Sequence, residues 1–161
     1  MPPRFVADSM LGRLAMWLRA FGLDTLYDPA LDDHGVIACA RARGAIALTR
    51  DTRFPQPPDV RIILVKSDHV AEQLNQVVEE APLDLAQARP LTRCTVCNEE
   101  LVPVTRGEVW DRIPPFVYLT NETYARCPGC GRVYWEGTHG PRIRAELARL
   151  AGRASADGGQ A

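Results

Sequence analysis

The first half of the chain alternates short apolar runs with longer stretches in which apolar residues recur every three or four positions. Short runs of β-branched and small apolar residues are typical of buried strands, and the longer repeat is typical of amphipathic helices. Strands and helices in this order form a mainly parallel sheet with flanking helices. We therefore expect an α/β fold. The strands are expected at residues 4–7, 25–27, 45–49 and 61–65, and the helices at 9–21, 33–43 and 69–80.

Polar residues and glycines mark the expected ends of these helices. Ser9 and Asp33 stand where the first and second helices begin, and their side-chain oxygens can cap free backbone N–H groups. Asp68 has the corresponding position before the third helix. Gly22 and Gly44 follow the first two helices, where glycine readily takes the left-handed conformation that ends a helix.

The second half of the chain has a different pattern. Short β-like runs there predict a small β-rich unit, with a short helix at 142–150. The segment before this unit has no periodicity, and the end of the chain is poor in bulky apolar residues. The expected division is therefore a first domain at 1–82, a linker at 83–93, a β-rich unit with its helix at 94–150 and a disordered tail at 151–161. The β-like runs are 101–104, 116–119 and 132–135.

Length and composition limit the class of protein. The chain has 161 residues, 46% of them hydrophobic and 24% charged, which suffices for one domain with a small appendage. No apolar run approaches the roughly 20 residues that a membrane-spanning helix needs, so we expect no membrane partner. The net charge of −1 gives no whole-molecule attraction to a polyanion, so any binding of nucleic acid must be local.

Four of the five cysteines form two CxxC pairs in the second half. Two such pairs separated by 29 residues have the spacing of a zinc ribbon, in which four thiolates hold one structural Zn²⁺. A rubredoxin-type iron site uses similar pairs, whereas a thiol-disulfide pair would need a CxxC at the start of a helix. Cysteines in this arrangement indicate a reducing, cytoplasmic compartment. The four expected ligands are Cys94, Cys97, Cys127 and Cys130.

Acidic residues follow the expected strands at the edge where ligands bind to an open parallel sheet. Asp8 and Asp51 come directly after the first and third strands. Converging carboxylates repel one another unless a cation neutralises them, and hard oxygen ligands suit Mg²⁺ or Mn²⁺. The pattern therefore predicts a metal-dependent nuclease site. Asp28, Asp33 and Asp68 lie near the same edge but serve equally well as turn or cap residues.

Two groups of motifs, one in each half, carry a resemblance to a known family. The first half contains FVADSMLGRLA at 5–15, WLR at 17–19, GLDT at 22–25 and ALTRD at 47–51. The second half contains RCTVCN at 93–98, PP at 114–115, CPGC at 127–130 and VYWEGTH at 133–139. In this order they resemble the PIN-like ribonuclease domain named for the C-terminal part of the Mut-seven exonuclease. The resemblance covers about residues 4–145.

The resemblance implies a PIN-like α/β fold, a C-terminal zinc ribbon and metal-dependent ribonuclease activity. It marks Asp8 and Asp51 as ligands of a catalytic Mg²⁺ or Mn²⁺. Asp33 is the expected third acidic ligand, with Asp32 as its close competitor. PIN domains usually use three or four acidic residues, often including a glutamate, and this chain has no glutamate before Glu72.

Four further residues are candidates for RNA binding. The guanidinium groups of Arg13 and Arg50 can each hold a phosphate through two hydrogen bonds, or equally form ion pairs that offset the carboxylates. Trp135 and His139 follow the second CxxC pair, where they can stack on and pair with single-stranded RNA. The alternative for Trp135 is a place in the small core of the ribbon.

The sequence therefore predicts a ribonuclease that hydrolyses RNA phosphodiester bonds with Mg²⁺ or Mn²⁺. Its catalytic residues are expected to be Asp8, Asp33, Asp51 and Arg50. A structural zinc ribbon is expected to help in binding the RNA, which is expected to be single-stranded. The alternative is a non-catalytic module that binds RNA or a protein on the same fold.

Overall fold

The computed structural model describes residues 1–137 and 139–158 and contains two separate sheets. The larger sheet has four parallel strands in the order β2-β1-β3-β4, so β1 and β3 are its central strands. The expected α/β fold with a parallel sheet is confirmed. Its strands are β1 (Phe5–Ala7), β2 (Thr25–Tyr27), β3 (Ile46–Thr49) and β4 (Ile62–Leu64).

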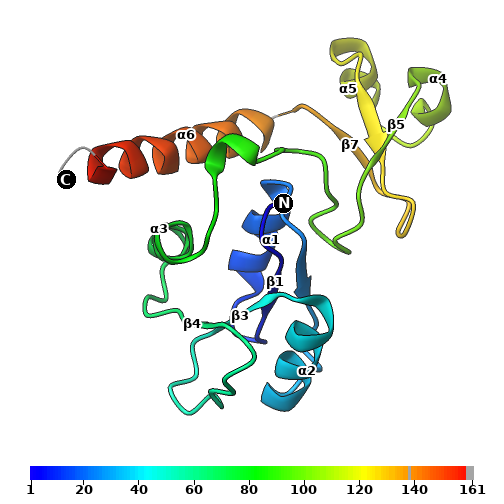
Figure 1. Cartoon of the computed structure of the whole chain (residues 1–161). Helices are drawn as coiled ribbons and strands as arrows, with labels where there is room; N and C mark the ends of the chain where they lie inside the picture. The colour runs from blue at the N-terminus through cyan, green and yellow to red at the C-terminus, as the bar shows by residue number, and fades with distance from the viewer. Residues whose placement is uncertain (138, 159–161) are drawn as a thin grey trace.

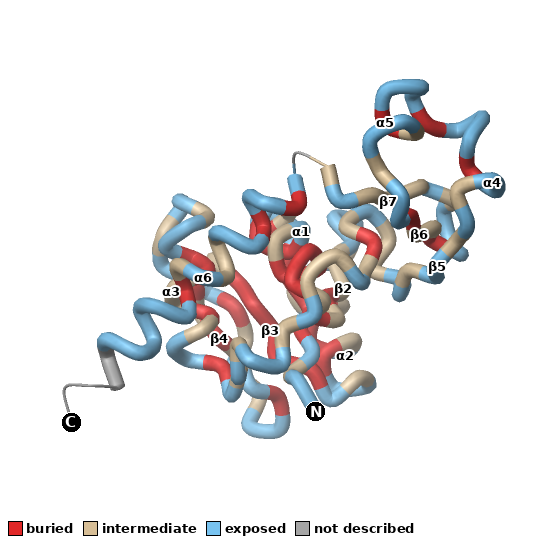
Figure 2. The backbone as a smooth tube through the Cα atoms, turned by 90° about the horizontal axis from the view of Figure 1, so that it is seen from above, coloured by how far each residue is buried: buried red, intermediate tan, exposed pale blue. Residues whose placement is uncertain are grey.

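Helices cover both faces of this sheet (Figure 1). Successive residues of a strand point to opposite faces, so Phe5 and Ala7 pack on one side and Val6 on the other. The first face is covered by α1 (Gly12–Ala20), α3 (Val70–Glu80) and α6 (His139–Gly158). The second is covered by α2 (Asp33–Arg43). Figure 2 shows buried residues concentrated along α1 and β3, at the centre of this arrangement.

The first two helices have different N-cap residues from those the sequence predicted. Helix α1 has Leu11 at its N-cap with no side-chain cap, because the chain first turns at Asp8, whose carboxylate accepts a hydrogen bond from the Met10 backbone N–H at 3.0 Å. Ser9 is therefore not the cap. Helix α2 is capped by Asp32, which accepts a hydrogen bond from the Gly35 N–H at 2.8 Å, so Asp33 falls in the first turn instead.

The other expected helix ends are confirmed for the glycines and wrong for Asp68. Gly22 and Gly44 both have positive φ angles, at 86° and 61°, and stand just beyond α1 and α2. Helix α3 begins after His69, whose N–H donates to the Ser67 hydroxyl at 3.0 Å. The exposed side chain of Asp68 makes no capping bond to this helix.

The smaller sheet is antiparallel, with strands in the order β5-β6-β7. Two short helices lie between β5 and β6, and one of them covers residues 116–119, where the sequence predicted a strand. Pro114 and Pro115 start this helix, since the fixed φ of proline suits a first helical turn. Its Val117 packs beside Tyr124 in a small second core. The elements are β5 (Val102–Val104), α4 (Arg106–Val109), α5 (Pro115–Thr120), β6 (Tyr124–Arg126) and β7 (Val133–Trp135).

The expected linker at 83–93 packs onto the larger sheet unit. It contains a short 3-10 helix, η1 (Leu85–Gln87), and its leucines pack against the main core. Its Arg89 and Leu91 N–H groups donate to the carbonyls of Phe21 and Ala20, both at 3.0 Å. The segment is therefore held against the end of α1.

Helix α6 is 20 residues long, whereas the sequence predicted a helix at 142–150 and a disordered tail from 151. Its Ile143 and Leu150 are buried in the main core, and Arg149 donates to the Asn75 side chain on α3 at 2.8 Å. These contacts hold the helix in a region of the chain that has few bulky apolar residues. Residues 159–161 of the expected tail lie outside the described residues. Of the described helices, none combines the length and apolar character needed to cross a bilayer.

Candidate functional site

The carboxylates of Asp8 and Asp51 lie at the carboxyl ends of the two central strands. Asp8 follows β1 and is only 5% exposed, and Asp51 stands two residues beyond the end of β3. Thr49, the last residue of β3, connects them. Its hydroxyl donates to the Asp8 carboxylate at 2.6 Å and accepts a hydrogen bond from the Asp51 N–H at 3.0 Å. The parallel pairing of β1 and β3 thus brings two residues 43 positions apart to one place.

Three donors hold the Asp8 side chain in place. One oxygen accepts from the Thr49 hydroxyl and from the Arg50 backbone N–H at 3.0 Å, and the other accepts from the Met10 N–H at 3.0 Å. A carboxylate has about four lone-pair sites, so this arrangement leaves one for a further partner. Asp8 is therefore a buried carboxylate held in one orientation, with one acceptor position left free.

Asp33 reaches the same place from the first turn of α2. Burial raises the pKa of the Asp33 carboxyl, and the negative charges of Asp51, Asp8 and Asp32 raise it further. Carboxyls in contact share a proton or require a cation, because two adjacent negative charges repel. The structure therefore places Asp33 within electrostatic reach of Asp51, Asp8 and Asp32, although the carboxylates of Asp8, Asp33 and Asp51 do not all lie within 4.8 Å of one another.

The two other candidate aspartates, Asp28 and Asp68, make only local contacts. Asp28 is exposed and accepts a hydrogen bond from the Ala30 N–H at 2.9 Å, which forms the turn after β2. The exposed Asp68 lies 3.6 Å from the His69 imidazole. Their turn and surface positions account for both.

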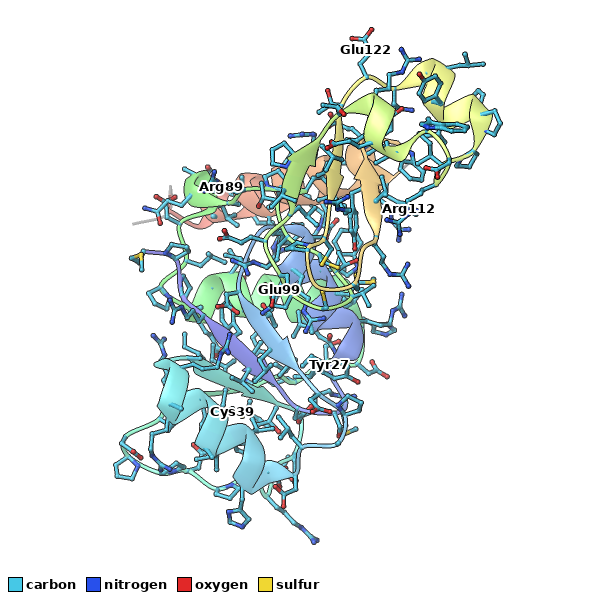
Figure 3. All side chains as sticks on the ribbon, turned by 90° about the vertical axis from the view of Figure 1, so that its right-hand side faces the viewer. Tyr27, Cys39, Arg89, Glu99, Arg112 and Glu122 are labelled. Carbon is cyan, nitrogen blue, oxygen red and sulfur yellow. The ribbon has the colours of Figure 1, made fainter. Side chains whose placement is uncertain are left out.

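Tyr27, the last residue of β2, lies at the same edge of the sheet. Its hydroxyl donates to the Ser9 carbonyl at 3.1 Å, and Figure 3 shows the side chain at the arrow end of its strand. A Cβ atom at Gly12 would lie 2.9 Å from this hydroxyl, so glycine is needed where α1 starts. Sequence reasoning missed Tyr27, whose only signal was its place as the last residue of an expected strand.

The two arginines that the sequence singled out differ in exposure. Arg50 is half-buried, and its Nε is buried without a hydrogen-bond partner among the described residues. Arg13 is exposed on the first turn of α1. An unpartnered guanidinium nitrogen beside a carboxylate cluster suits a phosphate oxygen, which accepts such a bond.

The four cysteines of the CxxC pairs form one cluster. Their sulfur atoms all lie within 4.8 Å of one another, and this is the only group of three or more such ligands that the described residues bring together. A tetrahedral zinc with Zn–S bonds of about 2.3 Å would have sulfurs about 3.8 Å apart. The Cys94–Cys130 pair is at 3.7 Å and the Cys97–Cys127 pair at 3.1 Å. The cluster can therefore hold a zinc ion.

Tyr134 orders the cluster from β7. Its hydroxyl lies 3.0 Å from the Cys94 sulfur and accepts a hydrogen bond from the Thr95 N–H at 3.3 Å. Burial raises the pKa of Cys94, but the Tyr134 hydroxyl and backbone N–H groups outweigh burial and lower it to about 6. The pKa of Cys97 is raised to about 12, first by its hydrogen bond with Cys127. The cluster thus favours one thiolate, and further deprotonation requires a cation.

The first CxxC pair is attached to the larger sheet, a contact that no pattern in the sequence indicated. Asn98, in the left-handed region at φ 72°, accepts a hydrogen bond from the Thr25 N–H at 3.0 Å and donates to the Asp24 carboxylate at 2.7 Å. The buried Arg19 of α1 donates to the carbonyls of Thr95 and Val96 at 3.1 and 3.0 Å. The cysteine cluster is therefore joined to edge strand β2 and to α1.

The candidate RNA-binding residues of the second unit differ in exposure. Trp135 on β7 is half-buried and packs against the small core of this unit, as the alternative interpretation required. His139 is exposed at the start of α6. Both also line a cavity that faces α1.

The fold and site together define an α/β protein with aspartates at the carboxyl edge of its sheet and an attached four-cysteine unit. Residues 3–147 match the family model described as the Mut7-C RNAse domain, and the chain belongs to this family. That description indicates a function of the ribonuclease type. No curated protein and no solved structure matches the chain significantly.

Proposed function

We propose that the protein is a Mg²⁺- or Mn²⁺-dependent ribonuclease that hydrolyses phosphodiester bonds in single-stranded RNA. The observation that carries the proposal is the hydrogen-bonded link from Asp8 through Thr49 to Asp51 at the carboxyl edge of the sheet, in a chain of an RNase family. Asp8 and Asp51 are linked through Thr49 where β1 and β3 end, and Asp33 in the first turn of α2 is near enough for their negative charges to act on it. Because their mutual repulsion destabilises the fold, this arrangement suggests a role in binding a cation.

The donor set fits a hard divalent cation. Asp8, Asp33 and Asp51 would hold it through carboxylate oxygens, the ligands that Mg²⁺ and Mn²⁺ prefer. When bound, such an ion lowers the pKa of an attacking water and stabilises charge on the leaving 3′ oxygen. Asp8 is already fixed by three hydrogen bonds, so it needs little rearrangement to serve as a ligand.

The two arginines would position the scissile phosphate. Arg50 is joined to Asp8 through its own backbone N–H, so its side chain starts at the carboxylate cluster. Its Nε is buried without a hydrogen-bond partner among the described residues, so a change of side-chain conformation would bring an unpaired donor to a phosphate oxygen. Arg13 is at the start of α1 and would hold a neighbouring phosphate.

The cysteine cluster would hold one structural zinc. Four thiolate ligands leave no open coordination position, so the ion would stabilise the fold and take no part in the cleavage. Trp135 and His139 would contribute to RNA binding from this side. In this proposal, residues 1–82 form the nuclease domain and 94–150 the zinc ribbon with its helix. The free cysteines fit a reducing, cytoplasmic compartment.

Cleavage of end-labelled single-stranded RNA, with and without EDTA, tests the proposal. EDTA should abolish cleavage, and Mn²⁺ added alone after mild EDTA treatment should restore it while the zinc content stays at one per chain. RNA binding without cleavage under every metal condition would favour the non-catalytic module. Iron in place of zinc in the purified protein would contradict the zinc assignment.

A further inference from the structure

A cavity of about 530 Å³ lies between the two units of the molecule. One wall is the second half of α1, which contributes Trp17. The opposite wall is β7, with Tyr134 and Trp135, and the start of α6 contributes His139 and Arg142. Its volume falls in the range of about 300–1,000 Å³ that is usual for small-ligand sites.

The lining combines aromatic rings with positive charge. The Arg142 guanidinium lies 5.5 Å above the ring of Trp17, and Arg142 and His139 are both exposed at the rim. The Arg93 Nε is buried without an acceptor among the described residues. None of the described residues that line the cavity is acidic. The cavity therefore suits a flat apolar group that carries a negative charge.

We propose that this cavity binds one unpaired nucleotide of a single-stranded RNA, with its base against Trp17 or Trp135 and its phosphate near Arg142 and His139. Every base has a flat face that can stack on an aromatic ring, and arginine pairs with phosphate. A base inside a duplex is already stacked and paired, so only an unpaired strand can present one. That this RNA strand is also the substrate of the enzyme rests on the proposed function.

Helix α1 connects this cavity with the aspartates. Arg13 is three residues before Met16 and four before Trp17, so the three side chains lie along one face of the helix. The helix starts at Gly12 beside the carboxyl edge, and its rise places Trp17 about 8 Å further along the axis. One strand therefore reaches both places, with Arg13 between them.

Binding measurements on uncleaved RNA test this inference separately from the chemistry. The probe is a fluorescein-labelled oligouridylate of about ten nucleotides, followed by anisotropy, and all proteins carry Asp8→Asn so that the strand stays intact. Trp135→Ala should weaken binding about tenfold, the loss of one base stack. Trp110→Ala is the matched control, because Trp110 is 65% exposed and does not line the cavity. Equal affinities in the two variants would overturn the inference.

Arg142→Gln gives an independent measurement if Trp135→Ala disturbs the fold. It should weaken binding severalfold and reduce the slope of affinity against salt by about one unit, the loss of one phosphate contact. Arg144→Gln is its control, since Arg144 lies on the same helix and pairs with Glu136 outside the cavity. Identical salt slopes in the two arginine variants would contradict the inference.

Two further ligands identify the source of the nucleotide. In a Trp110→Phe protein, the oligouridylate should quench the fluorescence of Trp17 and Trp135, whereas the same uridines paired in a duplex should not. Uridine monophosphate should bind far more weakly than the strand. Equal binding of the monophosphate would show a free-nucleotide site instead and overturn the assignment. If the wild-type protein does not cleave RNA but these binding differences persist, the proposed function is contradicted and the inferred nucleotide site is not.

Discussion

The Arg19 guanidinium on α1 donates a hydrogen bond to the backbone carbonyl of Thr95, 76 residues further along the chain, at 3.1 Å. The same side chain donates to the Thr25 carbonyl on β2 at 2.9 Å and to the Val96 carbonyl at 3.0 Å. One buried side chain therefore joins a helix, an edge strand and the first CxxC pair. Loss of the cysteine cluster should therefore destabilise the larger sheet unit, and loss of the Arg19 contacts should destabilise the cluster.

Replacing Arg19 tests this connection. Arg19→Met should lower the free energy of unfolding by about 2–3 kcal/mol, because three backbone carbonyls, one buried and two partly buried, lose their donor. It should also speed the release of zinc to a chelator. Urea unfolding and a colorimetric zinc assay measure the two effects. The exposed Arg13→Met on the same helix should change stability by less than about 0.5 kcal/mol, and an equal loss in both variants would refute the connection.

Zinc content tests the cysteine cluster. The purified protein should hold about one zinc per chain, and Cys94→Ser should lose it, because three ligands hold the ion far more weakly than four. Thermal melting should then fall for the whole chain and not for the ribbon alone. Cys39→Ser is the control. Cys39 lies on α2, outside the cysteine cluster, so its loss should leave the zinc content unchanged.

Tyr134→Phe should move zinc release to higher pH. The hydroxyl helps to lower the pKa of the Cys94 thiol to about 6, so without it protons compete better for the sulfur. Loss of such an outer partner typically weakens metal affinity by about tenfold or more. Acid titration followed by a zinc-sensitive dye gives the midpoint of release. Tyr118→Phe, on α5 and outside the cluster, should keep the wild-type midpoint.

The pKa of Asp33 predicts how acidity acts on the aspartate site. Burial and the neighbouring Asp51, Asp8 and Asp32 raise this pKa above its usual value, so folding favours the protonated carboxyl. Without divalent metal, this contribution to stability is complete at low pH and is lost as the pH rises through the raised pKa. Asp33→Asn should therefore melt at or above the wild-type temperature at neutral pH without metal.

Added Mn²⁺ should reverse that order. The ion should raise the melting temperature of the wild type more than that of Asp33→Asn, and its apparent affinity for the wild type should fall on acidification, since protons compete for the carboxyl. Melting curves across pH, with and without Mn²⁺, measure both effects. A stabilisation by Mn²⁺ that is equal in the two proteins would exclude Asp33 as a ligand.

Local patterns predicted the larger sheet because its strands and helices each have a clear period and order. The four-residue run at 116–119 is too short to distinguish a strand from a helix, and the prolines before it decided the outcome. Asp32 and Asp33 are adjacent candidates for one cap, and only the backbone geometry shows that Asp32 fills it and Asp33 is left for the site.

Contacts between segments distant in sequence explain the features that local patterns did not predict. The helix beyond residue 150 is held partly through Arg153 and Glu79, 3.1 Å apart on α6 and α3. The attachment of the first CxxC pair depends on Arg19, whose sequence neighbourhood reads as an ordinary amphipathic helix. The convergence of Asp8 and Asp51 was predictable, because the carboxyl ends of parallel strands meet at one edge.

Cleavage by aspartate variants tests the central claim most directly. Asp8→Asn and Asp51→Asn keep the side-chain size and remove one negative charge each, so both should fold and melt near the wild-type temperature. On single-stranded RNA at saturating Mn²⁺, each should cleave at least about 100-fold more slowly, because even outer partners of a bound metal contribute up to that factor. Asp28→Asn, at its exposed turn, should cleave nearly as fast as the wild type. Unchanged cleavage in folded Asp8 and Asp51 variants would contradict the proposed active site.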